Sequence, residues 1–532
     1  MTPKRRGADL VVDALVEAGV RHLFTLSGNH ILSLYDATIG RGVTLVHTRH
    51  EAAAVHMADA WGRLTGEPGV ALVTAGPGHA NALSALYGAL MAESPVVLLS
   101  GHCPRGEIGL GGFQEMDQVA AARPVAKAAW LAERPERAGD DVREALAVAA
   151  SGRPGPVHVS LPGDVLDTAV DVVAPARAAG REAASLTASA AHEIVAQLAG
   201  ARRPLILCGP ATARGAALQA LVETASVPAL GIESPRGVND PALRAAARCL
   251  ADADVVLLLG KALDFSLRFG GAPFTRDCRF WQVAPDAPAP AKSTRIERAW
   301  AADVDAALGS LVDAARARAW PASSWRADVE AARTSTPPGW DTLRRDPGAP
   351  MHPLAVARAL APWIDAGAVL VSDGGEFGQW MQAALEPRER LINSLSGSIG
   401  SAIPMAVAAK LRHPARTVLV TLGDGTFGYH AFELDTALRH GLPVVAVVGN
   451  DARWNAEHQL QIRQYGADRT VGCELRPSRY EQVAVALGGH GEYVERAGDL
   501  PGALERAVAS GRPACVNVRI AGVAAPTWPR VP

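Results

Sequence analysis

A glycine-rich turn in the last third of the chain is the clearest candidate for a chemical site. Gly423-Asp424-Gly425-Thr426-Phe427-Gly428 follows the apolar run VLVTL and precedes a segment with helical spacing of its apolar residues. The turn matches the pattern G-x-G-x-x-G, in which glycines let the backbone approach the pyrophosphate of a dinucleotide. Taken alone, this match predicts an oxidoreductase that uses NAD(P) or a flavin.

The charge of Asp424 favours a different ligand. A bare carboxylate inside the turn would repel a diphosphate by on the order of several kcal/mol at intermediate dielectric. A divalent cation between the two groups turns this repulsion into attraction, and Asp451, 27 residues later at the end of the next apolar run, offers a second carboxylate. Mg²⁺ is typically held by one or two carboxylates together with phosphate oxygens and water. We therefore interpret the turn as a metal–diphosphate site, while Asp424 as a helix cap is compatible with both ligands.

The segment that joins these two carboxylates resembles a family fingerprint. GDGTFGYHAFELDTALRHGLPVVAVVGND is similar to the diphosphate-binding signature of the thiamine-diphosphate enzymes that include acetolactate synthases, benzaldehyde lyase and 2-hydroxyacyl-CoA lyases. It departs from that signature at its last position, where Asp451 stands in place of an asparagine and adds negative charge. The resemblance implies thiamine diphosphate as cofactor, with Mg²⁺ bound by Asp424, Asp451 and the main-chain carbonyl of Arg453. It also implies cofactor contacts from Gly423, Asp424, Gly425, Thr426 and Asn450.

A glutamate near the N-terminus indicates the same family independently. Glu51 in TRHEAAAVHMADAWGRLTG lies between a predicted strand and a predicted helix, and together with VALVTAGPGHANAL this segment resembles the pyrimidine-binding domain of these enzymes. By itself, an acidic residue in a first helical turn is explained by the helix dipole. The resemblance implies that Glu51 donates a proton to the aminopyrimidine ring and so helps that ring to deprotonate the weakly acidic thiazolium carbon. Further cofactor contacts are expected from Gly28, Gly76, Pro77, Asn81 and Gly374.

Three other positions bear on the reaction. FTLSGNHI resembles a stretch of benzaldehyde lyase and of the second class of 2-hydroxyacyl-CoA lyases, which implies that His30 is catalytic. A group that titrates near neutrality suits proton transfer to or from a substrate hydroxyl. GGFQEMDQVAAARPVAK resembles acetolactate synthases and implies that Gln114 faces the active centre. NSLSGSIGSAIPMAVAAK implies that Ile399 wedges the cofactor into a bent shape, with ordinary core packing as its alternative role.

These resemblances predict a carbon–carbon lyase or carboligase that acts on a small 2-hydroxy ketone, a 2-hydroxyacyl-CoA or a 2-oxo acid. The C-terminal RIAGVAAPTWPRVP has only Arg530 as a basic residue after Arg519, which weakens the case for a CoA ester. Acetolactate synthase-type carboligation and 2-oxo acid decarboxylation are alternatives, and Asp451 leaves open a catalytically silent relative. Because Glu51 and Asp424 act on opposite ends of one cofactor, the family architecture implies a homodimer or homotetramer with active sites between subunits.

The elements that must position these residues repeat a strand–helix pattern. Short β-branched runs alternate with helical spacing, which predicts βαβ units and doubly wound parallel sheets whose ligands bind at the carboxyl ends of the strands. We expect three α/β domains: pyrimidine-binding (1–175), central and Rossmann-like (189–333), and diphosphate-binding (352–522). Joints rich in Pro, Ala and Gly lie between them at 174–188 and 334–353. By resemblance, the central domain binds FAD in some members and ADP or nothing in others.

The expected buried strands and helices are short. The strands lie at 22–26, 44–48, 69–74, 95–100, 204–209, 227–232, 254–260, 280–285, 368–375, 417–425 and 442–451. Helical spacing covers 51–64 and 79–91 in the first domain.

Composition excludes several other classes of protein. The 532 residues carry Lys+Arg 52 against Asp+Glu 54, a net charge of −2, without a basic stripe that would indicate a nucleic-acid partner. No apolar stretch reaches the roughly 18 residues of a membrane span, and the basic N-terminus lacks the apolar core of a signal peptide. Six scattered cysteines without a C-x-x-C pair are typical of a reducing compartment. We expect a cytoplasmic enzyme with a small-molecule substrate.

Overall fold

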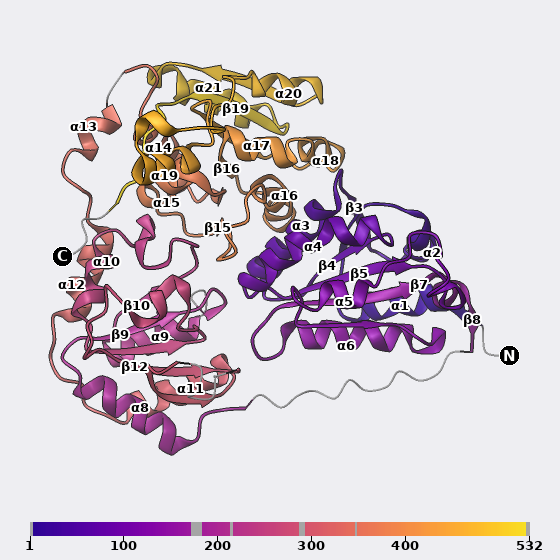
Figure 1. Cartoon of the computed structure of the whole chain (residues 1–532), viewed down its shortest axis with the longest axis horizontal. Coiled ribbons are helices and arrows are strands. Elements are labelled where there is room, and N and C mark those ends of the chain that lie inside the picture. The colour runs from indigo at the N-terminus through magenta and orange to yellow at the C-terminus, as the bar shows by residue number, and fades with distance from the viewer. Residues whose placement is uncertain (1–3, 172–183, 213–215, 287–292, 346–347, 528–532) are drawn as a thin grey trace.

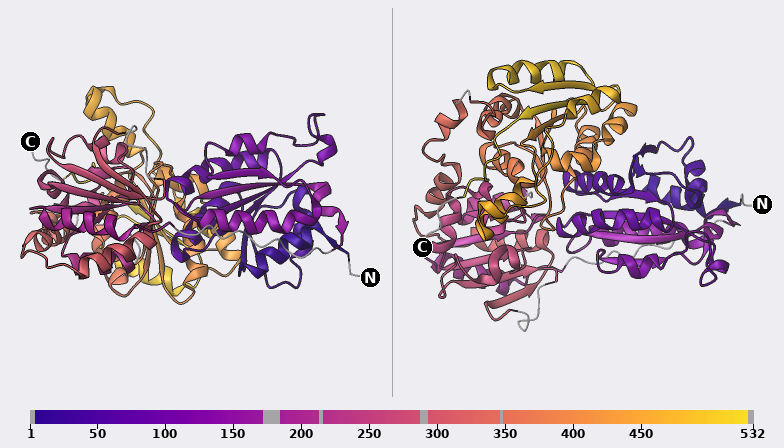
Figure 2. Two further views of the ribbon diagram at one scale, coloured as in Figure 1. Left: turned by 90° about the horizontal axis from the view of Figure 1, so that it is seen from below. Right: turned by 45° about the horizontal axis from the view of Figure 1, so that its top comes forward.

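Three parallel sheets organise the part of the chain that the structure describes. The computed structural model covers residues 4–171, 184–212, 216–286, 293–345 and 348–527. In Figure 1 the first sheet (indigo to purple) lies on the right, the central sheet (magenta) at the lower left and the third (orange to yellow) at the top. Figure 2 shows from two other directions that helices cover the sheets on both faces. This is the doubly wound α/β architecture that the sequence predicts.

The first sheet has six parallel strands in the order β3-β2-β4-β5-β7-β6. Successive residues of its strands alternate between two cores, because side chains of a strand point to opposite faces. One core packs against α1 and α6, and the other against α3 and α4. The elements are α1 (Gly7–Glu17), β2 (His22–Thr25), β3 (Thr44–His47), α3 (Glu51–Thr65), β4 (Gly69–Val73), α4 (Pro77–Met91), β5 (Val96–His102), β6 (Ala128–Leu131), α6 (Ala138–Ala150) and β7 (Pro156–Pro162).

The starts of α3 and α4 lie at the carboxyl edge of this sheet. The ring of His50 accepts a hydrogen bond of 3.1 Å from the amide of Ala52 and so caps α3. Gly66 ends α3 in a left-handed conformation, with φ of 76°. Pro77 begins α4, where its missing N–H leaves no helical bond unmade. Both helices therefore present their first turns beside the ends of β2 and β4.

The central sheet has five parallel strands in the order β10-β9-β11-β12-β13. The strand order reverses between β9 and β11, which is the point where sheets of this kind bind ligands. Helices α8, α9 and α11 cover one face, and α10 and α12 cover the other. The elements are α8 (Ala188–Gly200), β9 (Pro204–Cys208), α9 (Ala216–Ala225), β10 (Ala229–Gly231), α10 (Ala246–Asp252), β11 (Val255–Leu259), β12 (Arg279–Ala284), β13 (Ile296–Ala301), α11 (Val304–Arg316) and α12 (Trp325–Thr334).

The third sheet has six parallel strands in the order β15-β14-β16-β17-β19-β18. Helices α14, α15 and α21 pack on one face, and α16, α18 and α20 on the other. The elements are α14 (Pro353–Asp365), β14 (Val369–Ser372), α15 (Gly375–Ala384), β15 (Arg390–Ile392), α16 (Ala402–Arg412), β16 (Val418–Gly423), α17 (Asp424–His430), α18 (Glu433–Arg439), β17 (Val445–Asn450), α19 (Asn455–Tyr465), α20 (Tyr480–Ala486), β18 (His490–Val494), α21 (Leu500–Ala509) and β19 (Ala514–Arg519).

The first and third sheets share one hydrophobic core. Side chains of α3 and α4 pack with those of α16 in a single cluster, and Figure 1 shows these helices side by side. A hydrogen bond also crosses this contact: Arg63, paired within α3 with Asp59 at 2.6 Å, donates a 2.7 Å bond to the carbonyl of Ile392. The two domains are thus joined by core packing as well as by the chain.

Each predicted strand and helix overlaps an observed one, but the sequence missed β6, β7, β13, β15, β18 and β19, as well as the two-residue strands β1 (Arg5–Arg6) and β8 (Ala169–Val170), which pair with each other. The second predicted joint is not a plain linker, because it contains α13 (Trp340–Arg345), whose Trp340 is buried against α14. Most of the first joint lies outside the described residues. The domain limits at 1–175, 189–333 and 352–522 stay predictions. Within the described residues, no helix combines the length and the apolar character needed to cross a membrane.

Candidate active site

Glu51 and Asn81 are in direct contact at the carboxyl edge of the first sheet. Glu51 is the first residue of α3 and is 9% exposed. Asn81, in the second turn of α4, donates a hydrogen bond of 3.0 Å from Nδ2 to Oε2 of Glu51. A Cβ at Gly78 would lie 3.6 Å from the other carboxyl oxygen, Oε1. The carboxyl group is therefore held by one oxygen while the other faces a position without a side chain.

His30 lies on the same edge, in the short 3-10 helix η1 (Asn29–Ile31) after β2. Its Nδ1 is 3.3 Å from Oγ1 of Thr74, the residue that follows β4. The imidazole stacks on Phe113, with ring centroids 5.7 Å apart and planes at 18°. Burial lowers the pKa of His30, and a bond to the backbone of Phe113 opposes the shift. The ring is therefore neutral near pH 7 and can accept a proton.

Gln114 lies in tight backbone contact with Gly76. Both are in the left-handed region, with φ of 58° and 54°, and a Cβ on Gly76 would meet the carbonyl oxygen of Gln114 at 2.6 Å. The amide of Gly76 donates a 2.9 Å bond to Oε1 of Gln118. A Cβ on Gly28 would lie 2.3 Å from Cβ of Thr74. A side chain at Gly28 or Gly76 would therefore push apart the segments at the carboxyl edge of the first sheet.

Asp424, the first residue of α17, is 2% exposed, and its Oδ2 has no hydrogen-bond partner within the described part of the chain. Burial raises the pKa of this carboxyl to about 6, although backbone bonds from Gly425, Ala452 and Arg453 favour its charged form. An unpartnered buried carboxyl oxygen is costly. A cation next to Oδ2 would remove that cost.

Asp451 follows β17 and lies close to Asp424. Burial and the charge of Asp424 together raise the pKa of Asp451 to about 7. The chain turns sharply at Ala452, whose φ is 60°, and this turn brings the Arg453 backbone to Asp424. The structure thus gathers both carboxylates and the backbone segment that the sequence predicts as Mg²⁺ ligands. Two adjacent carboxylates, one buried and one partly exposed, are a donor set that suits a divalent cation.

Gly374 and Ile399 face each other beside the same edge of the third sheet. A Cβ on Gly374 would lie 3.0 Å from Cγ2 of Ile399. Asp373 shapes both segments, because it accepts hydrogen bonds from the amides of Gly374 at 2.7 Å, Gly400 at 2.9 Å and Ala402 at 3.2 Å. Burial raises the pKa of Asp373 to about 6 against these three bonds. Ile399 itself is only partly buried.

The side chain of Asn450 points into the third sheet. Its Nδ2 donates to the carbonyl of Ser478 at 3.0 Å and to Oδ1 of Asn517 at 3.1 Å. Its Oδ1 accepts a 3.0 Å bond from Arg519. Asn450 therefore braces the end of the strand that carries Asp451.

Two further predicted residues lie at helix starts. The hydroxyl of Thr426 donates a 3.0 Å bond to the carbonyl of Gly423 and closes the first turn of α17. Pro77 is exposed at the first position of α4. Both shape the ends of helices that begin at the two carboxyl edges.

Within one chain, the segment before Glu51 contacts the third domain at the C-terminal end of α17. His430, the last residue of that helix, contacts the ring of His50 with centroids 5.7 Å apart. Nearby, the amide of Arg49 donates a 3.0 Å bond to Oε1 of Glu433. Asp424 lies at the opposite end of α17, about 10 Å along the helix axis. The segment before Glu51 therefore faces His430 rather than the carboxylate pair.

Comparison with known proteins identifies the family. Residues 5–121 match the N-terminal TPP binding domain of thiamine pyrophosphate enzymes, and residues 373–518 match their C-terminal TPP binding domain. The chain belongs to the thiamine pyrophosphate enzymes. Thiamine pyrophosphate is another name for thiamine diphosphate, so the family predicted from the fingerprint and from Glu51 is confirmed.

Relatives of two kinds resemble nearly the whole chain. An acetolactate synthase large subunit of Mycobacterium tuberculosis is 36% identical over 523 residues, which cover 96% of this chain and 94% of the relative. The 2-hydroxyacyl-CoA lyase 2 of Homo sapiens is 32% identical over 553 residues, covering 92% and 85%. A 2-hydroxyacyl-CoA lyase of Oryza sativa subsp. japonica is 31% identical over 560 residues, covering 97% and 95%.

Family membership makes this chain a thiamine-diphosphate-dependent enzyme of the carbon–carbon lyase and transferase class. This family membership overturns the interpretation of GDGTFG as the dinucleotide-binding loop of an oxidoreductase. The buried, unpartnered oxygen of Asp424 gives the physical reason, because the turn presents negative charge where a dinucleotide needs bare amide groups.

Sequence reasoning missed several residues that shape the site. Thr74 contacts His30, Phe113 stacks on His30, Gln118 binds Gly76, and Asp373 fixes the segment of Ile399. The sequence contains only weak indications of these roles. Thr74 and Asp373 each come directly after an apolar strand, and Phe113 is a large aromatic residue in a glycine-rich segment.

Charged groups of the first domain reach the switch point of the central sheet. Oε2 of Glu93 accepts a 3.2 Å bond from the amide of Ala211, just beyond β9. Arg153 donates a 2.7 Å bond to the carbonyl of Gly260, which follows β11. Sheets of this kind bind ligands at this switch point, and here Glu93 already accepts a bond from the Ala211 amide.

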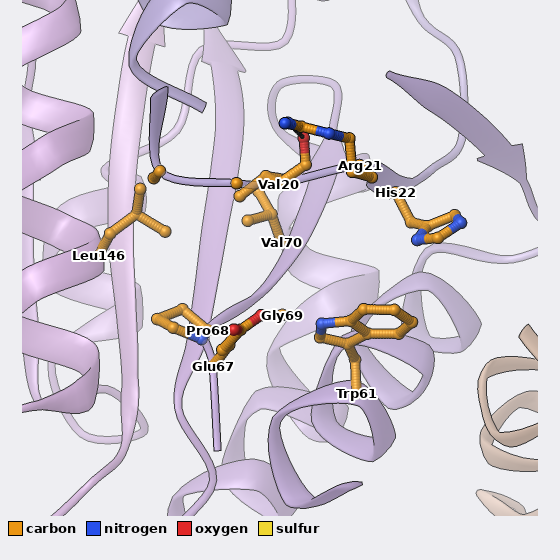
Figure 3. Close-up of a pocket in the computed structure, with 11 residues that line it drawn as sticks. Val20, Arg21, His22, Trp61, Glu67, Pro68, Gly69, Val70 and Leu146 are labelled. Carbon is orange, nitrogen blue, oxygen red and sulfur yellow. Dashed lines mark hydrogen bonds between the residues drawn. The ribbon is translucent and has the colours of Figure 1, made fainter. Parts of the chain in front are cut away.

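A separate pocket lies at the opposite edge of the first sheet (Figure 3). His22 and Trp61 face each other across part of it, with ring centroids 5.0 Å apart. Its lining comes from the amino ends of β2 and β4, including Val20, Arg21 and Val70. Because His30, Thr74 and Glu51 lie at the carboxyl ends, this pocket is not part of the candidate active site.

Proposed function

We propose that this enzyme breaks or forms a carbon–carbon bond next to a hydroxyl-bearing or carbonyl carbon, using thiamine diphosphate and Mg²⁺. The substrate class is a small 2-hydroxy ketone, a 2-hydroxyacyl-CoA or a 2-oxo acid. The observation that carries the proposal is the placement of a neutral histidine, His30, on the same edge as Glu51, with Thr74 between the two segments. The similarity to 2-hydroxyacyl-CoA lyases supports the lyase direction, and the similarity to an acetolactate synthase keeps carboligation as the alternative.

The residues around Asp424 fit Mg²⁺. Asp424, Asp451 and the main-chain carbonyl of Arg453 would hold the ion, and the unpartnered Oδ2 of Asp424 supports this assignment. Each carboxylate makes the charge of the other more costly, as the raised pKa of Asp451 indicates. A bound cation reverses that effect. Gly423, Gly425 and Thr426 would border the diphosphate, and Asn450 would act by bracing Asp451.

When bound, thiamine diphosphate supplies a nucleophilic carbon and stores the electron pair of the broken bond. Glu51, oriented by Asn81, holds a proton at the aminopyrimidine ring. His30 takes a proton from the substrate hydroxyl in the lyase direction and returns it in the carboligase direction. Gly28, Gly76 and Pro77 shape the pyrimidine side.

Other segments would form the parts of the candidate active site that face the substrate and the thiazolium ring. Gln114 and Phe113 border the substrate beside His30. Gly374 would leave room for the cofactor beside Ile399, and Ile399 would pack against the cofactor and favour its bent shape. The partial exposure of Ile399 supports a role beyond the core.

The active site is proposed to form between two subunits of a homodimer or homotetramer. Within one chain, the segment before Glu51 faces His430 at the far end of α17. Glu51 of one subunit would therefore work with Asp424 and Asp451 supplied by a partner. The six cysteines, all buried and free, support a reducing compartment such as the cytoplasm.

A substrate screen tests the proposed function. Purified enzyme with thiamine diphosphate and Mg²⁺ is assayed with pyruvate, benzoin-type hydroxyketones and 2-hydroxyacyl-CoA esters, and aldehyde or acetolactate is measured. We expect cleavage of a hydroxyketone or a hydroxyacyl-CoA; acetolactate from pyruvate would select the alternative. No turnover of any of them would favour a silent relative. Extraction of the same sample decides whether the central domain carries FAD, ADP or neither.

A further inference from the structure

The loop between β5 and α5 (Gln118–Ala122) presents Phe113 and Gln114 to the candidate site. Gly109 and Gly111 each have φ of 81°, and Gln114 has φ of 58°. A non-glycine residue in the left-handed region is strained, so it persists only where its surroundings hold it. Such a loop requires restraints at defined points.

Glu115 supplies the first restraint. Its carboxylate accepts hydrogen bonds from three loop amides: Gly109 at 2.5 Å, Gly111 at 2.9 Å and Gly112 at 2.9 Å. These backbone bonds lower the pKa of Glu115, so it is ionised at neutral pH. Bonds to a charged acceptor are shorter and stronger than those to a neutral one. The carboxylate therefore holds the loop backbone together at residues 109–112, immediately before Phe113.

Gln118 supplies the second restraint, from inside the domain. It is 1% exposed, and its Oε1 accepts a 2.9 Å bond from the amide of Gly76. Its Nε2 donates to the carbonyl of Gly101 at 3.1 Å and to Oγ of Ser160 at 3.0 Å. A Cβ on Gly101 would lie 2.6 Å from Cβ of His30. Gln118 thus ties the segment after β4 to the carboxyl-end residues of β5 and β7.

We propose that Glu115 and Gln118 are positioning residues that hold Phe113 and Gln114 against His30 and Gly76, so that the substrate side of the site is preformed. Neither acts on reacting atoms. The inference rests on the proposed function, in which this side of the site binds substrate. A displacement of about 1 Å at such a position can cost about 100-fold in rate.

The substitution Glu115→Gln tests the outer restraint with little change of shape. Glutamine keeps one acceptor oxygen and turns an NH₂ group toward the amides that the other oxygen served. Glu136→Gln is the matched control, because Glu136 lies outside the loop and pairs on the surface with Arg134 at 2.7 Å. Glu115→Asp retains the charge and is expected to recover part of the loss. Gln118→Met removes the inner bonds at similar volume.

Two measurements are made on the holoenzyme. Hydrogen exchange of residues 105–117 is followed by mass spectrometry, and kcat and KM are measured with the substrate found active in the screen. For Glu115→Gln we expect faster exchange at residues 109–112 by about tenfold or more, and a loss of kcat/KM of about 10- to 100-fold. Thiamine-diphosphate affinity should stay within about threefold, and Glu136→Gln should match the wild type.

Unchanged exchange in Glu115→Gln would overturn the proposal, and so would faster exchange with unchanged kcat/KM. If Gln118→Met does not fold, Glu115→Gln still decides the matter. If the wild type turns over no substrate, the proposed function fails, while the exchange measurement separately decides whether Glu115 restrains the loop.

Discussion

The side-chain amide of Asn81 donates a 3.0 Å hydrogen bond to Oε2 of Glu51. The bond joins the starts of two helices and holds the carboxyl group in one orientation. Oε1 lies beside Gly78, where a Cβ would be 3.6 Å away. This arrangement suits a residue that must hold a proton toward a planar ring.

Replacing Glu51 with glutamine should remove turnover but not the fold. Glutamine retains an acceptor for Asn81 and loses the exchangeable carboxyl proton, so kcat should fall by about 100-fold or more. Calorimetric titration should give thiamine-diphosphate and Mg²⁺ affinities close to those of the wild type. Glu67→Gln, at the other end of α3, serves as the control. Wild-type turnover by Glu51→Gln would contradict the assigned role.

A hybrid enzyme can test whether the site lies between subunits. Glu51→Gln and Asp424→Asn chains, each inactive alone, are co-expressed with different tags and the mixture is assayed. If Glu51 of one subunit serves Asp424 of the other, each hybrid dimer contains one intact site, and random pairing restores about a quarter of the wild-type activity. If both residues serve a site within one chain, the mixture stays inactive. An active monomer in analytical ultracentrifugation would also refute the arrangement.

The two metal carboxylates should respond differently to neutralisation. Asp424→Asn removes the more deeply buried charge and its unpartnered oxygen, so Mg²⁺ affinity should fall by about 100-fold, in line with about 3 kcal/mol for a lost charged ligand. Asp451→Asn restores the residue usual in the fingerprint and should change the affinity by less than about tenfold. Titration with Mg²⁺ in the presence of thiamine diphosphate measures both. Equal losses would show that Asp451 is a full partner in binding the ion.

His30 should set the acidic limb of the activity profile. Burial lowers its pKa below the usual 6.5, so the neutral, proton-accepting form persists to more acidic pH. Wild-type kcat/KM should decline only below that value, and His30→Ala should lose about 100-fold together with this limb. Profiles of kcat/KM between pH 5 and 8 provide the measurement. A limb that persists in His30→Ala must come from another group.

Glu433 should make stability depend on pH. Burial raises its pKa from 4.5 to about 7, so the folded protein holds the proton more tightly than the unfolded chain. The free energy of unfolding therefore falls as pH rises from about 4.5 to about 7, by at most about 3 kcal/mol. Glu433→Gln keeps an acceptor for the Arg49 amide and should flatten this dependence. Melting temperatures at pH 5 and pH 8 test it, and an unchanged difference between them would contradict the prediction.

The sequence predicted the positions of the candidate site residues better than the contacts between those residues and their neighbours. Glu51, Asp424 and His30 each follow an apolar strand, so their place at a carboxyl edge could be predicted from the pattern alone. The bond between Asn81 and Glu51 could not, because it depends on how α3 and α4 lie across the sheet. The contact between His30 and Thr74 likewise joins two strand ends whose side chains no periodicity relates.

The missed strands have two physical explanations. β6, β13, β15 and β18 are short or partly exposed strands at or near sheet edges, so they lack a continuous apolar run. β7 and β19 are buried but contain polar residues, namely His158 and Ser160 in one and Asn517 in the other. Those side chains bond within buried networks, which offsets the cost of burial and hides the strands from a hydropathy pattern.

The common core of α3, α4 and α16 also limits how this protein can be recombined. A chimera that takes only the first or only the third domain from a relative would set unmatched side chains against each other across that core. The bond from Arg63 to the Ile392 carbonyl also crosses this core and would have to be preserved. The two cofactor-binding domains therefore have to be exchanged together. The central domain has two cores of its own, so a replacement there has to preserve chiefly the bonds from Glu93 and Arg153.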